Sequence, residues 1–350
     1  MVATLRRLSI ASASAALIIC GTIQTAAAKG DDALFEDVDS YTTTISANQD
    51  IADIYFPQPS NNQNNTEFPI ALLLQGANVD KSNYSKFANI VASYGFVVVV
   101  PNHEKSVPQL NSTGLFAETS QIEAVQAQIS AENSNPASPI AGIVDTDKLA
   151  LLGHSYGGAV GLGAIANLCQ PIICDGDYTR PDELVAGAFF GANLRNQNEE
   201  FIPINNSGIP IALLQGNIDS IALPFRAKAT YNNIQTPPKT LIDISGVNHY
   251  GITNTNNPDG ARSDTNTPTL DQDVAVETVA RWSGLFLRAS VLDDKDAIDY
   301  IYSKGDDLDE NVSVINQATP VPESTSELSF TTGLVVLSVW GALLRRKKQK

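Results

Sequence analysis

The chain has 350 residues, 43% of them hydrophobic and 17% charged, which is enough to bury a large core. Acidic residues outnumber basic ones by 38 to 22, giving a formal net charge of −16. Such a surface repels phosphate backbones, so it excludes nucleic-acid binding and favours neutral or cationic substrates.

The first 28 residues have the layout of a signal peptide. Arg6 and Arg7 precede an uncharged apolar stretch over residues 8–23, and three alanines at 26–28 supply a small-residue cleavage site. We therefore predict a cleaved signal peptide at 1–28, with a permanent membrane anchor as the alternative.

Short apolar runs alternate with helix-like segments through the body of the protein, which we expect to span residues 29–318. Runs of four to six residues are typical of strands buried on both faces of a parallel sheet. The alternation predicts an α/β domain with a mostly parallel central sheet flanked by helices and no large lid. Strands are predicted at 70–74, 96–100, 149–152, 185–190, 211–214 and 240–244, helices at 84–93, 119–132, 159–168, 224–231 and 274–291, and Asn-rich surface loops at 57–66 and 253–269.

A G-x-S-x-G motif, Gly153-His154-Ser155-Tyr156-Gly157, follows the third predicted strand. Glycines are needed there because the backbone turns so sharply that a Cβ at Gly153 or Gly157 would collide with neighbouring chain, and the turn lifts the serine hydroxyl above the sheet. The helix that follows stabilises negative charge at its N-terminus. We predict a nucleophile elbow with Ser155 as the nucleophile; the alternative is a glycine-rich turn with a bystander serine.

The chain has three histidines from which a base for Ser155 can come. His154 lies within the motif, where a structural role is expected, and His103 lies upstream and is assigned to a loop or rim. His249 follows the predicted strand at 240–244 and is predicted to be the base, the alternative being a structural loop histidine.

The third member of a serine triad is a carboxylate that orients the histidine. Asp219 follows the strand at 211–214 and a glycine turn, which suits an acid that reaches over the sheet edge. Asp243 is the competitor, but it lies within a strand only six residues before His249. We predict Asp219, which gives the chain order Ser, Asp, His.

An oxyanion requires two convergent backbone N–H groups. We expect one from Tyr156, directly after the nucleophile. The other is expected from the loop that follows Gln75-Gly76, with Ala77 preferred and Asn78 as the alternative.

Taken together, the oxyanion loop, the elbow, the acid turn and the turn around His249 resemble the dienelactone hydrolase, chlorophyllase and PAF-acetylhydrolase-like branch of the α/β-hydrolases. Bacterial polyester hydrolases and cutinase-like lipases are also similar, and the resemblance covers nearly all of residues 50–292. It implies the α/β-hydrolase fold. Two positions differ: Gln75 stands where the family has histidine, and the nucleophile is serine rather than the cysteine of dienelactone hydrolases.

From these features we expect an exported carboxylic-ester hydrolase that acts on a small-molecule or polymeric ester through an acyl-enzyme, with no cofactor and no metal. A catalytically silent binding module and an amidase or peptidase with the same triad are the alternatives. The sequence leaves the acyl chain, the alcohol and the oligomeric state open.

The two cysteines of the body, Cys169 and Cys174, lie five residues apart. In an oxidising compartment we expect a local disulfide between them, with two buried thiols as the alternative. Neither has a histidine or cysteine partner at metal-ligand spacing.

The last 32 residues, 319–350, resemble a PEP-CTERM sorting signal. Pro322 and Glu323 precede an uncharged segment at 328–344, which is roughly 26 Å long as a helix, and five basic residues follow it. Ser324 stands where the second proline of the signal usually lies. We predict a transmembrane segment with its basic end in the cytoplasm, processed by a sorting peptidase or kept as a plain anchor, and a periplasmic or cell-surface body.

Overall fold

The computed structural model describes residues 31–58, 66–174 and 176–318. Both the predicted signal peptide and the predicted tail, including its membrane segment, lie outside these ranges. No helix within the described ranges is long and apolar enough to cross a membrane.

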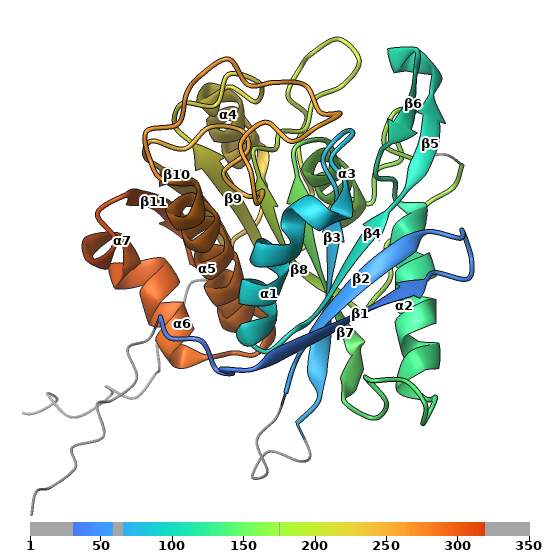
Figure 1. Ribbon diagram of the computed structural model, residues 1–350. Coiled ribbons are helices and arrows are strands. Elements are labelled where there is room, and N and C mark those ends of the chain that lie inside the picture. Colours follow the sequence, from blue (N-terminus) through green and yellow to red (C-terminus); the bar gives the residue numbers. More distant parts are fainter. Residues whose placement is uncertain (1–30, 59–65, 175, 319–350) are drawn as a thin grey trace, which may run out of the picture.

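A nine-stranded mixed sheet forms the centre of the molecule, in the order β1-β2-β4-β3-β7-β8-β9-β10-β11 (Figure 1). The six strands from β4 to β10 in this order are parallel, whereas β2 runs antiparallel to β4, β1 to β2 and β11 to β10. The strands of this sheet are β1 (Val38–Thr44), β2 (Ile51–Pro57), β3 (Phe68–Leu74), β4 (Val97–Asn102), β7 (Val144–His154), β8 (Leu184–Phe190), β9 (Ile211–Gly216), β10 (Lys239–Ile244) and β11 (Val312–Gln317).

Helices cover both faces of the sheet (Figure 1). One face packs against α1 and α5, the other against α2, α3 and α4. The helices are α1 (Ser85–Ser93), α2 (Ser120–Asn133), α3 (Tyr156–Ile165), α4 (Pro224–Asn233), α5 (Gln272–Val291), α6 (Lys295–Asp299) and α7 (Gly305–Leu308), with short turns η1 (Lys81–Tyr84), η2 (Pro108–Leu110) and η3 (Tyr300–Lys304).

Strand β3 shows why the central strands read as unbroken apolar runs. Leu72 and Leu74 belong to the core on the α2 and α3 side, whereas Ala71 and Leu73 belong to the core on the α1 and α5 side. Successive side chains point to opposite faces, and both faces here are buried, so every position must be apolar.

All six predicted strands and all five predicted helices are confirmed, with ends that differ by a few residues. Helix α3 begins at Tyr156, directly after the nucleophile Ser155 and within the motif, rather than at 159. The sequence prediction missed β1, β2 and β11 of the large sheet and a separate hairpin of β5 (Glu104–Val107) and β6 (Ser112–Leu115). This hairpin stands beside the carboxyl edge of the sheet (Figure 1).

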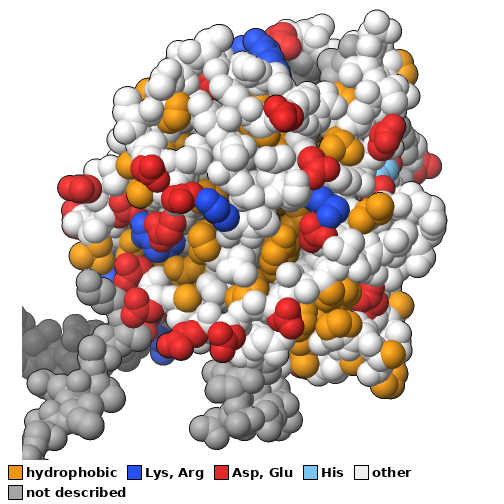
Figure 2. Space-filling model, in the orientation of Figure 1, with side chains coloured by type: hydrophobic (Ala, Val, Ile, Leu, Met, Phe, Trp, Pro, Cys, Tyr) orange, Lys and Arg blue, Asp and Glu red, His pale blue; other side chains and the backbone are white. Residues whose placement is uncertain are grey.

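Acidic side chains are spread over the face of the molecule shown in Figure 2, with few basic ones among them. On this face the negative charge is therefore spread out rather than gathered in one patch.

Candidate active site

Ser155 lies in the sharp turn between β7 and α3, with φ 53° and ψ −115°. Positive φ is a strained conformation for a serine, and it is the conformation a nucleophile elbow requires. The turn also brings Gly157 so close to β3 that a Cβ there would lie 2.1 Å from the Leu74 carbonyl oxygen. A side chain at Gly157 would therefore displace the backbone of β3, as the sequence analysis expected.

His249 connects Ser155 to Asp219. Its Nε2 lies 2.8 Å from Ser155 Oγ, and its Nδ1 lies 2.6 Å from Asp219 Oδ2. A carboxylate accepts hydrogen bonds, so Nδ1 carries the proton and Nε2 is left to accept from the serine hydroxyl. The structure thus brings the three predicted residues into the arrangement of a serine triad, with His249 and Asp219 buried.

Asp219 is held on both oxygens. Its Oδ1 accepts hydrogen bonds from Ile221 N and Ala222 N, each at 2.7 Å, while Oδ2 faces His249 and the amide of Gln215. Backbone donors of this kind fix the orientation of the carboxylate. The acid therefore presents one oxygen to the imidazole in a defined direction.

Asp243, the competing acid, lies on β10 directly beside Gln215 of β9. It lines a separate small cavity of about 280 Å³ that also contains Phe225 and Ile315. Burial raises the pKa of Asp243. In the structure, the carboxylate that contacts His249 Nδ1 is that of Asp219.

Asp264 is a residue that the sequence analysis missed. Its carboxylate accepts hydrogen bonds from His249 N at 3.0 Å and from Ser220 N at 3.1 Å. Asp264 therefore joins the turn that carries His249 (the base turn) to the turn that carries Asp219 (the acid turn). Burial alone would raise the pKa of Asp264, but hydrogen bonds from the Ser220 hydroxyl and these amides hold it below its usual range. It lies in the stretch 253–269, which is irregular as predicted but packs against the triad at this point.

A second chain of hydrogen bonds runs behind the triad through His154. Its Nε2 lies 3.0 Å from the His249 carbonyl oxygen, its Nδ1 lies 2.9 Å from Tyr84 Oη, and Tyr84 Oη accepts from Gly76 N at 2.9 Å. Because a carbonyl only accepts, Nε2 is protonated and Tyr84 donates to Nδ1. Burial, together with the proximity of His249, holds the pKa of His154 well below its usual range, so the ring is neutral.

This chain connects the base turn, the elbow and the oxyanion loop in one buried network. Gly76 packs directly on the imidazole, since a Cβ there would lie 2.6 Å from His154 Nδ1. Tyr84 comes from η1, 70 residues away from His154 in the chain. The expected structural role of His154 thus has a specific form: it fixes the position of His249 relative to the loop that contains Ala77.

We predict that Tyr84→Phe destabilises the protein and slows catalysis. The change leaves Gly76 N and His154 Nδ1 without their buried partner, at a cost of about 1–3 kcal/mol in the free energy of unfolding. The loosened base turn should lower kcat by up to about 10²-fold. Urea unfolding and steady-state kinetics measure the two effects.

Tyr178→Phe is the matched control, because the buried Tyr178 hydroxyl has no hydrogen-bond partner within the described residues. It should unfold at the same urea concentration as the wild type or a higher one. Equal stability of the two phenylalanine variants would contradict a role for the Tyr84 hydroxyl in this network.

The oxyanion loop is anchored on both sides of Ala77. Gly76 N donates to Tyr84 Oη, and Asn78 N donates to Leu115 O of the β5–β6 hairpin at 2.7 Å. The Asn78 amide is therefore engaged within the protein, which favours Ala77 over Asn78 as the loop donor. Gln75 donates to the His103 carbonyl and so ties the start of the loop to the residue that follows β4.

His103 is engaged by two carboxylates. Its Nδ1 lies 2.9 Å from Asp50 Oδ2 and its Nε2 lies 3.3 Å from Glu118 Oε1, while Lys105 Nζ lies 2.8 Å from the other oxygen of Glu118. Burial lowers the pKa of His103, but the hydrogen bonds and charges of the two carboxylates raise it to about 9. The ring is therefore an imidazolium in a structural ion cluster, and it is not placed to act as the base for Ser155.

This shift predicts how stability depends on pH. The folded pKa of His103 lies above the value of about 6.5 expected in the unfolded chain, so the cluster stabilises the fold fully below about pH 6.5 and loses this contribution as the pH rises through 9. We expect the difference in unfolding free energy between wild type and His103→Gln to shrink steadily between pH 6.5 and pH 10. A difference that stays constant over this range, measured by urea unfolding, would contradict the assignment.

Cys169 and Cys174 form a disulfide in the structure. Among the residues that the structure describes, no group of three histidine, cysteine or acidic side chains is placed to hold a metal ion.

The mostly parallel sheet with helices on both faces, together with a serine in a strained turn after β7, fits the α/β-hydrolase fold. Residues 36–169 match the family model for chlorophyllase. This span includes the loop of Ala77 and the elbow of Ser155 and ends before Asp219 and His249. The match supports a hydrolase of the esterase type and part of the resemblance drawn from the sequence. No curated protein matches the chain.

Proposed function

We propose that the protein is a carboxylic-ester hydrolase that works through an acyl-enzyme. The observation that supports it most is the unbroken hydrogen-bond path from Ser155 Oγ through His249 to Asp219 at the carboxyl edge of the sheet. The chlorophyllase match over residues 36–169 supports the same class of reaction.

In this proposal Ser155 Oγ attacks the ester carbonyl carbon, and His249 Nε2 takes the hydroxyl proton. The backbone N–H groups of Tyr156 and Ala77 stabilise the oxyanion of the tetrahedral intermediate. His249 then returns the proton to the departing alcohol, which leaves an acyl-Ser155. Water, deprotonated by His249, attacks the acyl carbonyl carbon, and His249 returns the proton to the departing Ser155 Oγ, which releases the carboxylic acid and restores the serine hydroxyl. Asp219 keeps the imidazole oriented throughout.

A panel of neutral esters, amides and peptides assayed with the purified protein tests this function. We expect turnover of esters, with kcat/KM for amides of the same acyl group far lower. Turnover of amides or peptides at equal or greater rates would replace the proposal with an amidase or peptidase. No turnover of any substrate, with no labelling by a fluorophosphonate, would point to a catalytically silent binding module.

We also propose that the protein is exported and held at the membrane by its C-terminal segment, as a periplasmic or cell-surface enzyme. The disulfide supports export, because such bonds persist in oxidising compartments. Protease added outside the cytoplasmic membrane should digest the body, and deletion of residues 320–350 should release it in soluble form. Mass spectrometry of the mature C-terminus separates processing near Pro322 from an intact anchor that keeps Lys350. Full-length protein in the cytosol, with Met1 present, would contradict export.

A further inference from the structure

A cavity of about 450 Å³ lies one helical turn from the nucleophile, within the size range of small-molecule sites. Tyr156 and Ala159 of α3 line it, and the Ala159 amide donates to the Ser155 carbonyl at 3.1 Å. Ala159 is half-buried, so its methyl group meets the open space of the cavity. The cavity is therefore continuous with the first turn of the helix that carries the oxyanion donor.

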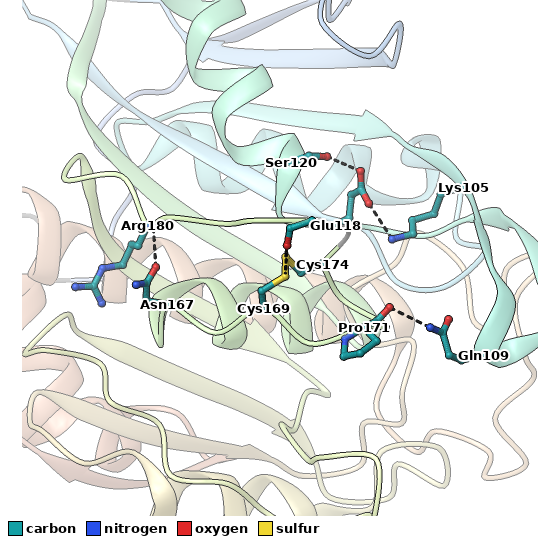
Figure 3. Close-up of a disulfide and its surroundings, with 10 residues drawn as sticks. Lys105, Gln109, Glu118, Ser120, Asn167, Cys169, Pro171, Cys174 and Arg180 are labelled. Carbon is teal, nitrogen blue, oxygen red and sulfur yellow. Dashed lines mark hydrogen bonds and ion pairs between the residues drawn. A yellow bond between two sulfur atoms is a disulfide. The ribbon is translucent and has the colours of Figure 1, made fainter.

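Another wall of the cavity is formed by the segment closed by the disulfide. Cys169 and Cys174 bracket Pro171 and Ile172, which line the cavity, and Figure 3 shows the side chain of Gln109 directed at the Pro171 carbonyl. The Tyr156 hydroxyl donates to the Ile172 carbonyl, which ties this wall to α3. Short of breaking the disulfide, the wall has little freedom to move away from the nucleophile.

The chemistry of the lining residues indicates which kind of chemical group the cavity binds. Tyr156, Ala159, Ile172 and Leu194 contribute aromatic and aliphatic groups to the lining, and amide side chains such as Asn193 line it as well. Arg195, the one cation of the lining, is paired with Glu199 and donates to Asn193 at 2.8 Å. Its charge is thus neutralised within the protein, so the cavity favours an apolar, uncharged group over a carboxylate.

We propose that this cavity binds the apolar arm of a neutral ester substrate, with the disulfide-closed segment as its outer wall. The inference rests on the proposed function, and it adds the substrate class: esters with one arm of several methylene groups. The arm belongs to either the acyl or the alcohol part, and the experiment distinguishes the two.

Ala159→Trp fills the cavity from the α3 side and is the main variant. Two ratios of kcat/KM are measured: p-nitrophenyl octanoate to p-nitrophenyl acetate, which varies the acyl arm, and octyl acetate to ethyl acetate, which varies the alcohol arm. We expect one ratio to fall by about 10-fold or more, because burying one or two methylene groups in a hydrophobic pocket already changes kcat/KM by about that factor. Ala131→Trp, an exposed alanine on α2, is the matched control and should leave both ratios unchanged.

Opening the wall with Cys169→Ser and Cys174→Ser together should lower the same ratio as Ala159→Trp. A fall in the acyl ratio assigns the cavity to the acyl arm, and a fall in the alcohol ratio assigns it to the alcohol arm. If the wild type hydrolyses the short esters but both kcat/KM ratios are unchanged in Ala159→Trp, the cavity inference is wrong while the proposed function stands.

Binding measured without turnover separates the two proposals further. Saturation-transfer NMR on the inactive Ser155→Ala variant should show contact between the protein and one of two chains: the octyl chain of octyl acetate or the acyl chain of ethyl octanoate. This contact should disappear in the double variant Ser155→Ala/Ala159→Trp. If the contact is lost in the double variant but the wild type hydrolyses no ester, the cavity inference is supported and the proposed esterase function is contradicted. Equal contact in both variants would overturn the cavity inference.

Discussion

Ser155→Ala is expected to abolish ester hydrolysis, with a fall in kcat of about 10⁶-fold, the scale seen when a triad serine is removed. Wild type should react with an active-site-directed fluorophosphonate once per chain, and the alanine variant should not react. The physical reason is that Ser155 is the hydroxyl within 2.8 Å of His249 Nε2, which makes it the activated nucleophile of the arrangement. Intact-protein mass spectrometry measures the labelling.

Ser134→Ala, at an exposed position after α2, serves as the control and should be labelled like wild type. Undiminished labelling of Ser155→Ala would show that another nucleophile reacts. The far-UV spectrum of the variant should match that of wild type, because alanine removes one oxygen from a half-buried side chain.

Asp219→Asn is expected to lower kcat by about 10⁴-fold, because the amide no longer holds the proton on His249 Nδ1 and the imidazole adopts the wrong tautomer. Asp243→Asn should change kcat far less. Asp243 lines a separate cavity that also contains Gln215, and burial raises its pKa. Steady-state kinetics on the two variants, at equal folded concentration, gives the comparison.

The test depends on which of the two asparagine variants loses more activity. A larger loss in Asp243→Asn than in Asp219→Asn would mean that the catalytic acid was misassigned. Comparable losses in both would mean that Asp243 acts on the site through Gln215, which donates to Asp219 Oδ2 at 3.4 Å.

The fold was predictable where the sheet is buried on both faces. Strands such as β3 carry apolar residues at every position and stand out from the chain. By contrast, β1 has no fully buried residue and β11 only one, so their sequences look like polar loops. Such edge strands depend on a neighbour for pairing, and nothing local in their sequence identifies that neighbour.

The site was predictable to the extent that its residues belong to local motifs. Ser155 sits in a five-residue pattern, and Asp219 and His249 each follow a strand end. Tyr84 and Asp264 were missed because their roles depend on partners 70 and 15 residues away and on burial that no spacing reveals. An acid within an Asn-rich stretch looks like solvent-exposed loop until the fold brings it against the base.

The direction of the last strand has a consequence for how the enzyme meets its substrate. Because β11 is antiparallel to β10, the chain leaves the sheet at Gln317 on the edge opposite to Ser155, and β1 begins at that same rear edge. If the membrane tether that we propose continues from this end of the chain, it joins the body at the edge of the sheet opposite to Ser155. In that proposed arrangement, the point of attachment would not lie across the carboxyl edge, where Ser155 meets substrate in the proposed function.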